Sequence, residues 1–250
     1  MLNINGINEK EALILRKKTE SGPKLIISDL DGTAVDMGMA YARAEEHVLQ
    51  DEDACAFVRS KMKKGRGVVE VYSQACKRFN IEKSVTAILS EVRDMVRESI
   101  DGNDIVMPGL REIFEDTRKN HGKVAISTNN TRENANMILH ATEDPLVKYV
   151  NRLWCAGDVS RKKGYSHVTK PKPEPDVFLA CCDWFGVSPD EALVLEDSIS
   201  GIEAARNAKI PVFVYYNGHN SDILNLADAF IPDYTQLDYS SISTVWNLVR

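Results

Sequence analysis

The stretch KLIISDLDGTAVD, residues 24–36, is a short apolar run that ends in two aspartates and a glycine. Its apolar letters LII do not alternate with polar residues, which is typical of a parallel strand buried on both faces. In an extended chain, residues i and i+2 point to the same side, so Asp29 and Asp31 share a face. The stretch therefore predicts a buried strand with two carboxylates at its carboxyl end, where open α/β sheets bind ligands.

The rest of the chain changes its periodicity twice. From about residue 37 to residue 103, apolar side chains recur every three or four residues, as in KSVTAILSEVRDMVRESI at residues 83–100, which is typical of helices. After Pro108, predicted helices alternate with strands. These strands are expected at residues 123–127, 153–156, 192–196, 211–216 and 229–231. Such alternation implies right-handed crossovers and a parallel sheet.

The predicted fold class is therefore α/β: a doubly wound, Rossmann-like parallel sheet as the core domain, with an inserted all-helical domain. The expected core covers residues 22–36 and 104–250, and the helical insert covers residues 37–103. Residues 1–21 are expected to form an N-terminal leader with one short helix, which ends before the Ser21-Gly22-Pro23 break.

Composition excludes several classes of protein. The net charge of −6 and a pI near 5.5 argue against a general nucleic-acid binder. The five cysteines are irregularly spaced and fit neither a disulfide framework nor a zinc site, which favours a reducing cytoplasm. The N-terminal apolar run, ALIL, is far shorter than a signal sequence or a membrane span. A chain of 250 residues can bury its own core, so either a monomer or a homodimer is expected.

Three later segments place groups that suit phosphate or metal at predicted strand ends or in loops. STNN offers the Thr128 hydroxyl and the Asn129 backbone N–H, KPEPDVF offers Lys172, and VLEDSISG offers Glu196 and Asp197. Each has an ordinary structural alternative. Asp and Gly in DLDGT are common turn residues, Ser, Thr, Asn and Asp often cap helices, and a loop lysine is usually solvated.

The ordered combination is more specific than any single member. DxDGT, a threonine after a strand, KPxP, and ED after a strand together resemble the motifs of the haloacid dehalogenase-like superfamily, in its phosphatase branch. The resemblance runs from Lys24 to about Leu237 and is closest to phosphoglycolate-phosphatase-like and β-phosphoglucomutase-like members. In that family, a helical insert after the first motif is a C1 cap.

The resemblance implies a role for each of these side chains. Asp29 is expected to be the nucleophile that forms an aspartyl-phosphate, and Asp31 the general acid and base. The expected Mg²⁺ ligands are Asp29, the backbone carbonyl of Asp31, and Asp197, with Glu196 bound directly or through water. The groups expected to hold the phosphoryl oxygens are Thr128, the backbone of Asn129, and Lys172.

Two assignments have competing interpretations. In MKKGRG of the helical insert, Lys64 and Arg66 are candidates for a second anionic group of the substrate, or are simply solvated at a helix end. The segment SRKKGYSHVTKPK is longer and more basic than in typical relatives, and it offers Lys170 as a rival to Lys172. The complete KPxPDxF pattern begins at Lys172, which favours that residue.

These inferences predict a cytoplasmic, Mg²⁺-dependent phosphatase acting on a small phosphorylated metabolite, with no nucleic-acid or membrane partner. A sugar phosphomutase needs the same Asp29 and Asp31 and is the first alternative. A non-catalytic phosphate-binding protein is the second, although both carboxylates of the expected chemistry are present. Phosphonate hydrolysis is disfavoured because relatives with that activity have alanine at the position of Asp31. Dehalogenation is disfavoured because it needs neither Asp31 in this role nor a metal.

Overall fold

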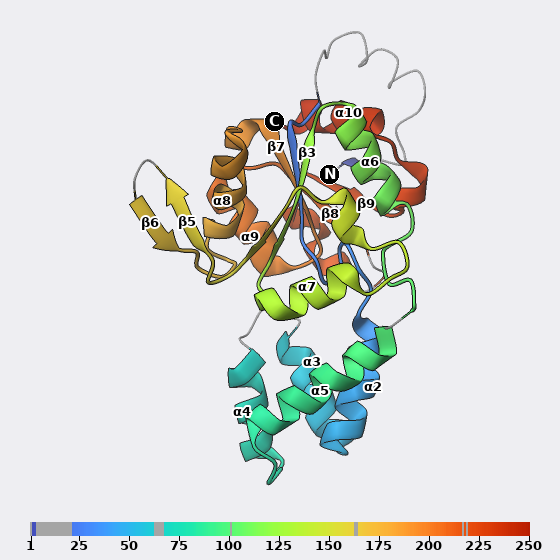
Figure 1. Ribbon diagram of the computed structural model, residues 1–250, viewed down its shortest axis with the longest axis vertical. Helices are drawn as coiled ribbons and strands as arrows, with labels where there is room; N and C mark the ends of the chain where they lie inside the picture. The colour runs from blue at the N-terminus through green and yellow to red at the C-terminus, as the bar shows by residue number, and fades with distance from the viewer. Residues whose placement is uncertain are drawn as a thin grey trace. The chain divides into compact units, whose positions relative to one another are not determined.

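The computed structural model describes residues 2–3, 22–62, 68–100, 102–162, 165–216, 218 and 220–250 (Figure 1). The predicted leader helix, Lys64 and Arg66 lie outside these residues. Contacts divide the chain into two compact units. The first contains Met1–Val35, Val106–His140 and Asp144–Arg250, and the second contains Asp36–Ile105 and Ala141–Glu143.

The first unit is built on a seven-stranded sheet in which every pair of neighbouring strands is parallel. The strand order is β1-β9-β8-β7-β2-β3-β4. The strands are β1 (Leu2–Asn3), β2 (Leu25–Ser28), β3 (Lys123–Thr128), β4 (Arg152–Cys155), β7 (Ala192–Glu196), β8 (Val212–Tyr215) and β9 (Ala229–Ile231). The sequence predicts six of them within one or two residues; it does not predict β1, which pairs with β9 at the sheet edge.

Helices cover both faces of this sheet, as the doubly wound class requires. Figure 1 shows α8 and α9 on one side of the central strands, with α6 and α10 on the other. The α-helices of this unit are α6 (Leu110–Lys119), α7 (Arg132–His140), α8 (Asp176–Phe185), α9 (Ile199–Ala208) and α10 (Tyr239–Val249). Short 3-10 helices lie at η2 (Leu146–Tyr149), η3 (Pro189–Glu191), η4 (Ser221–Leu226) and η5 (Tyr234–Gln236).

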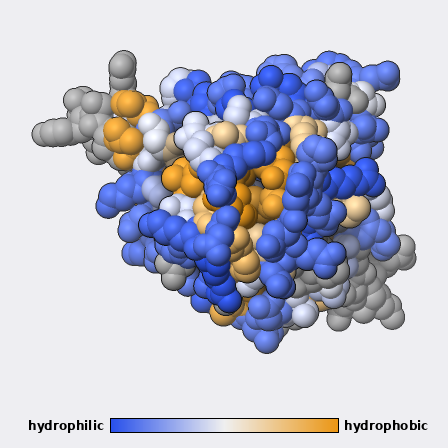
Figure 2. Space-filling model, turned by 90° about the horizontal axis from the view of Figure 1, so that it is seen from below, coloured by the Kyte–Doolittle hydropathy of each residue, from blue (hydrophilic) through white to orange (hydrophobic). Residues whose placement is uncertain are grey.

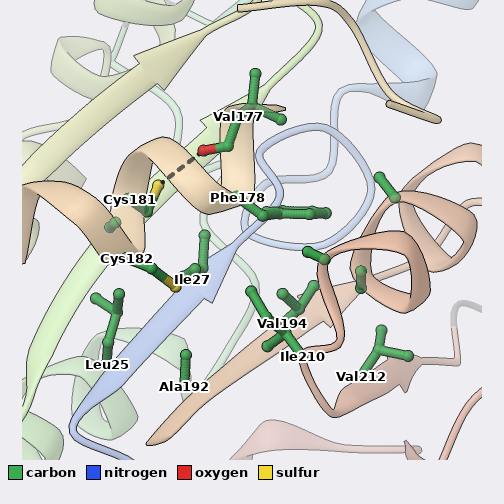
Figure 3. Close-up of a cluster of buried hydrophobic side chains, with 14 of the residues drawn as sticks. Leu25, Ile27, Val177, Phe178, Cys181, Cys182, Ala192, Val194, Ile210 and Val212 are labelled. Atoms are coloured by element: carbon green, nitrogen blue, oxygen red, sulfur yellow. Dashed lines mark hydrogen bonds between the residues drawn. The ribbon is translucent and has the colours of Figure 1, made fainter. Parts of the chain in front are cut away.

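A dry hydrophobic cluster holds α8 and α9 against the sheet (Figure 3). Leu25 and Ile27 of β2 meet Phe178 and Cys181 of α8, and all four side chains are fully buried. The Cys181 thiol donates to the Val177 carbonyl at 3.2 Å, so it behaves as a small core residue. Burying side chains of this size stabilises the fold by about 1.5–3 kcal/mol each. This packing fixes β2, and hence the residues that follow it.

A two-stranded antiparallel hairpin occupies the basic segment before Lys172. It consists of β5 (Val159–Lys162) and β6 (Tyr165–Val168), in which Val159 is paired with Val168. Both valines are exposed. Figure 2 shows apolar atoms at the left edge of the molecule, the side on which Figure 1 draws β5 and β6. No hairpin is predicted here from the sequence, but the hairpin accounts for the extra length of the segment.

The second unit is helical throughout its named elements: α2 (Gly38–Leu49), α3 (Glu52–Met62), α4 (Val68–Arg78) and α5 (Val85–Ile100). A buried carboxylate joins three of these helices. Glu45 of α2 accepts a hydrogen bond from the Tyr72 hydroxyl of α4 at 2.9 Å and one from Arg59 Nε of α3 at 3.2 Å. Because both carboxylate oxygens are satisfied, the charge is tolerated inside the bundle.

Across the described part of the chain, none of the helices combines the length and the apolar character needed to cross a bilayer.

Candidate active site

The carboxyl ends of β2, β3 and β7 meet at one edge of the sheet. Their register pairs Ser28 with both Ile126 and Leu195, so the three strands end side by side. Asp29 follows β2, and its backbone N–H donates to the Leu195 carbonyl at 2.9 Å, which fixes it beside β7. Glu196 is the last residue of β7, and Asp197 comes directly after it. One carboxylate oxygen from each of Asp29, Glu196 and Asp197 lies within 4.8 Å of the others.

The ammonium of Lys172 lies among these carboxylates. Its Nζ donates to Asp29 Oδ1 at 2.6 Å, to Glu196 Oε1 at 2.6 Å and to the Ser127 carbonyl at 2.8 Å. These three protein oxygens match the three protons of an ammonium, so any contact with a phosphoryl oxygen must be shared with one of them. The side chain is buried, whereas the rival Lys170 is exposed. The structure thus places Lys172, and not Lys170, beside Asp29.

Asn129 fixes the backbone of Lys172. Its side-chain Oδ1 accepts the Lys172 backbone N–H at 2.8 Å, and its Nδ2 donates to the Lys172 carbonyl at 3.2 Å. From the sequence, only the backbone of Asn129 is expected in the site. The Asn129 side chain also connects the loop after β3 to the loop that carries Lys172, through these two hydrogen bonds.

Both oxygens of Glu196 are engaged by the protein. Oε1 accepts from Lys172, while Oε2 accepts from the backbone N–H of Asp197 at 3.0 Å and from the N–H and hydroxyl of Ser198 at 3.1 Å and 2.9 Å. Ser198 also caps α9 by accepting from the Gly201 N–H. A Cβ on Gly201 would lie 1.9 Å from the Glu196 carboxylate, so only glycine fits at that position.

Asp197 is held by residues from two other loops. The Thr33 hydroxyl donates to Asp197 Oδ1 at 3.2 Å, and the Asn220 amide donates to the Asp197 carbonyl at 3.2 Å. Gly32 has φ +89° and brings its Cα against this carboxylate, where a Cβ would lie 2.2 Å from Oδ2. Thr33 is the threonine of DLDGT, so this motif could have identified it as a site residue. Asn220 has no sequence signal.

Burial and mutual repulsion set the charges of the site. Burial, followed by the Glu196 carboxylate, raises the pKa of Asp197 to about 7. Burial also raises the pKa of Asp31, opposed by a hydrogen bond from Asn130. Burial lowers the pKa of Lys172, but the carboxylates of Asp29 and Glu196 outweigh it and hold that pKa above its usual range. Lys172 is therefore a permanent cation that keeps Asp29 within a short ion pair.

The donor set fits a hard divalent cation. The oxygens of Asp29, Glu196 and Asp197 that lie together are all carboxylate oxygens, the ligands that Mg²⁺ prefers. Lys172 is a single cation among these three carboxylates, and burial, followed by the Glu196 carboxylate, raises the pKa of Asp197, so a divalent cation would favour its ionised form. Both oxygens of Glu196 already accept hydrogen bonds from the protein, so a direct bond from Glu196 to a metal would have to share or replace one of them.

Thr128, the last residue of β3, and Asn130 in the loop after it lie at the same sheet edge. Thr128 is buried, and its hydroxyl oxygen accepts the Asn130 backbone N–H at 3.0 Å. The Asn130 side chain donates to Asp31 Oδ2 at 3.2 Å. Asn130 is not among the site residues predicted from the sequence. Lys64 and Arg66, which it does select, lie outside the described residues and stay a prediction.

Comparison with known proteins identifies relatives of the chain. Its sequence matches the family described as haloacid dehalogenase-like hydrolase over residues 26–215. Protein CbbY of Rhodobacter capsulatus is 30% identical over 129 residues, which cover 51% of this chain and 53% of that protein. Phosphoglycolate phosphatase of Nitrosospira multiformis is 25% identical over 218 residues, which cover 84% of this chain and 91% of that protein.

Solved structures share the fold. β-Phosphoglucomutase of Clostridium difficile superposes with a TM-score of 0.67 at 21% identity, covering 91% of this chain and 100% of that one. CbbY of Rhodobacter sphaeroides, solved in complex with xylulose-(1,5)bisphosphate, gives 0.66 at 17% identity, covering 86% and 99%. The family match includes every motif that places a carboxylate, the lysine or the threonine at this sheet edge. The chain therefore belongs to the haloacid dehalogenase-like hydrolase family.

Proposed function

We propose that the protein is a Mg²⁺-dependent phosphatase that hydrolyses a small phosphorylated metabolite through an aspartyl-phosphate on Asp29. The observation that carries this proposal is the position of Asp29 at the carboxyl end of β2, with Oδ1 held by Lys172 at 2.6 Å and with Asp31 two residues further along. Burial raises the pKa of Asp29 and the Lys172 ammonium opposes that shift. A carboxyl group fixed by an ammonium, beside a second carboxyl group, suits nucleophilic attack on phosphorus followed by proton transfer.

The residues would act in two steps. In the first, a carboxylate oxygen of Asp29 forms a bond to phosphorus, the bond from phosphorus to the leaving oxygen breaks, and that oxygen takes a proton from Asp31. In the second, Asp31 removes a proton from water, which attacks phosphorus and releases Asp29 and phosphate. Thr128, the Asn129 backbone and Lys172 would hold the phosphoryl oxygens. Mg²⁺ on Asp29, Asp197 and the Asp31 carbonyl would supply positive charge against the phosphoryl group.

The proposed substrate is a phosphorylated sugar or a small phosphorylated acid. The names of the phosphoglycolate phosphatase relative and of the sugar-bisphosphate complex of CbbY support this class. Lys64 and Arg66 are proposed to contact a second anionic group of such a substrate, with the helical unit acting as the cap. We further propose a cytoplasmic protein, monomeric or homodimeric, which cell fractionation and light scattering would test.

A sugar phosphomutase is the second candidate. The likeness to β-phosphoglucomutase favours it, and the chemistry at Asp29 and Asp31 would be shared. In a mutase, the phosphorylated sugar replaces water as the acceptor of the phosphoryl group.

A substrate screen would test both candidates. The purified protein would be incubated with Mg²⁺ and with sugar 1-phosphates, phosphoglycolate, nucleotides and phosphonates, while free phosphate and sugar isomers are measured. Release of phosphate from one class supports the phosphatase, and isomer formation without free phosphate supports the mutase. The absence of both from the whole panel would favour the non-catalytic phosphate-binding alternative.

Stabilisation of the protein by Mg²⁺ is expected to increase with pH. Because the pKa of Asp197 is about 7 in the metal-free fold, above the value of roughly 3.9 for an unfolded aspartate, that fold loses stability as pH rises through about 7. Mg²⁺ binds the deprotonated carboxylate and offsets this loss. We expect the gain in Tm on replacing EDTA with Mg²⁺ to be larger at about pH 8 than at about pH 6.

The control for this experiment is Asp197→Asn, in which the titrating carboxyl group is absent and the gain should be small at both pH values. A gain in Tm that is the same at both pH values in the unsubstituted protein would contradict the assignment of Asp197 as a metal ligand.

A further inference from the structure

Asn130 is held in one orientation by hydrogen bonds at both ends of its side-chain amide. Its Oδ1 accepts the backbone N–H of Thr131 at 2.9 Å. Because a backbone N–H can only donate, this contact defines Oδ1 as the oxygen and turns the NH₂ group the other way. That group donates to Asp31 Oδ2 at 3.2 Å, across 99 residues of sequence. Asn130 is thus a hydrogen-bond donor to Asp31 and not an acceptor from it.

This contact makes the two oxygens of Asp31 different. Oδ2 accepts from Asn130, whereas Oδ1 is buried and has no hydrogen-bond partner among the described residues. In a protonated carboxyl group, the carbonyl oxygen is the better acceptor, so the amide favours the proton on the other oxygen. An orphaned buried oxygen is costly unless a ligand or a transferred proton uses it. Of the two Asp31 oxygens, Oδ1 is therefore the one left available to carry a proton.

Asn130 contacts Asp31 through its side chain, whereas its backbone N–H bonds to Thr128. The backbone N–H of Asn130 donates to the Thr128 hydroxyl oxygen at 3.0 Å, which leaves the hydroxyl proton free to be donated to a ligand. Any residue except proline at this position keeps that N–H. Changing the side chain of Asn130 therefore acts on Asp31 while the backbone contact with Thr128 is retained.

We propose that Asn130 is a positioning residue that directs Oδ1 of Asp31 toward the leaving oxygen of the substrate. The inference rests on the proposed phosphatase function. As the bond from Asp29 to phosphorus forms and the bond to the leaving oxygen breaks, the electron pair of the broken bond stays on the leaving oxygen. The proton from Asp31 Oδ1 neutralises that oxygen, and Asn130 holds Oδ2 throughout.

The dependence of the rate on the leaving group tests this role. Asn130→Leu keeps the approximate size and loses the amide, and Asn130→Asp keeps the acceptor for Thr131 and loses the donor. The substrates are the alkyl phosphate that the unsubstituted protein hydrolyses fastest and p-nitrophenyl phosphate, whose leaving group departs without protonation. We expect kcat for the alkyl phosphate to fall by about 10²-fold in both variants, and kcat for p-nitrophenyl phosphate by less than about 10-fold.

Three controls separate the outcomes. Asp31→Asn should give the same leaving-group pattern, and adding Asn130→Leu to it should cause little further loss. Asn136→Leu makes the same chemical change at an exposed position of α7 and should alter neither rate. Equal losses for both substrates in the Asn130 variants would overturn the positioning role. If the unsubstituted protein releases phosphate from neither compound, the proposed function itself fails, whatever Asn130 does.

Discussion

Asp29→Asn is expected to lower phosphate release by at least about 10³-fold, because an amide is a poor nucleophile and cannot form the aspartyl-phosphate. The substitution keeps the size of the side chain, and its oxygen can still accept from Lys172, whose second carboxylate partner is Glu196. The fold should therefore persist, so that the loss reports chemistry. Asp31→Asn is expected to lower phosphate release strongly as well, since it removes the proton donor.

The measurement combines rates with mass spectrometry of the intact protein. Unsubstituted protein quenched during turnover should carry one added phosphoryl group, and Asp29→Asn should carry none. Asp190→Asn is the matched control, because Asp190 is an exposed carboxylate in η3, outside the site. Full turnover by a pure preparation of Asp29→Asn would show that the nucleophile is assigned to the wrong residue.

Lys172→Met is expected to destabilise the protein by about 3–5 kcal/mol and to remove activity. The ammonium is buried between Asp29 and Glu196, each 2.6 Å from Nζ. Without it, two buried carboxylates face each other with no cation, and one must be protonated for the fold to form. Methionine fills a similar volume beside the Phe178 ring, so the loss would reflect the missing charge and not a cavity.

Urea unfolding and phosphate release would be measured together for this variant. The matched control is Lys170→Met, at the exposed rival lysine, which should change the free energy of unfolding by less than about 0.5 kcal/mol. Adding Glu196→Gln to Lys172→Met should recover part of the stability, because it removes one of the two unpaired charges. If Lys170→Met abolished turnover while Lys172→Met did not, the phosphate lysine would be Lys170.

Much of the fold follows from local patterns. The unalternating run before Asp29 predicts a buried parallel strand, and alternating helices and strands after Pro108 predict a doubly wound sheet, which the structure has. Two elements escape this reasoning. β1 contains only Leu2 and Asn3, too few residues to show a period, and it is a strand only because β9 offers it an edge. The β5–β6 hairpin lies in a polar, basic segment that lacks a strong apolar alternation.

Strand periodicity is a local property of the chain, so the sequence predicts which chemical groups follow the strands. That pattern predicts Asp29, Thr128 and Asp197 at strand ends, and the resemblance to the haloacid dehalogenase-like family adds Lys172 from a predicted loop. Which of these groups are in contact depends on the three-dimensional fold. Lys172 meets an aspartate 143 residues away, and Asn130 meets one 99 residues away, through contacts that no local pattern encodes. Such pairs exist only because parallel strands from distant parts of the chain end side by side, so that hydrogen bonds and charge pairing are settled in three dimensions.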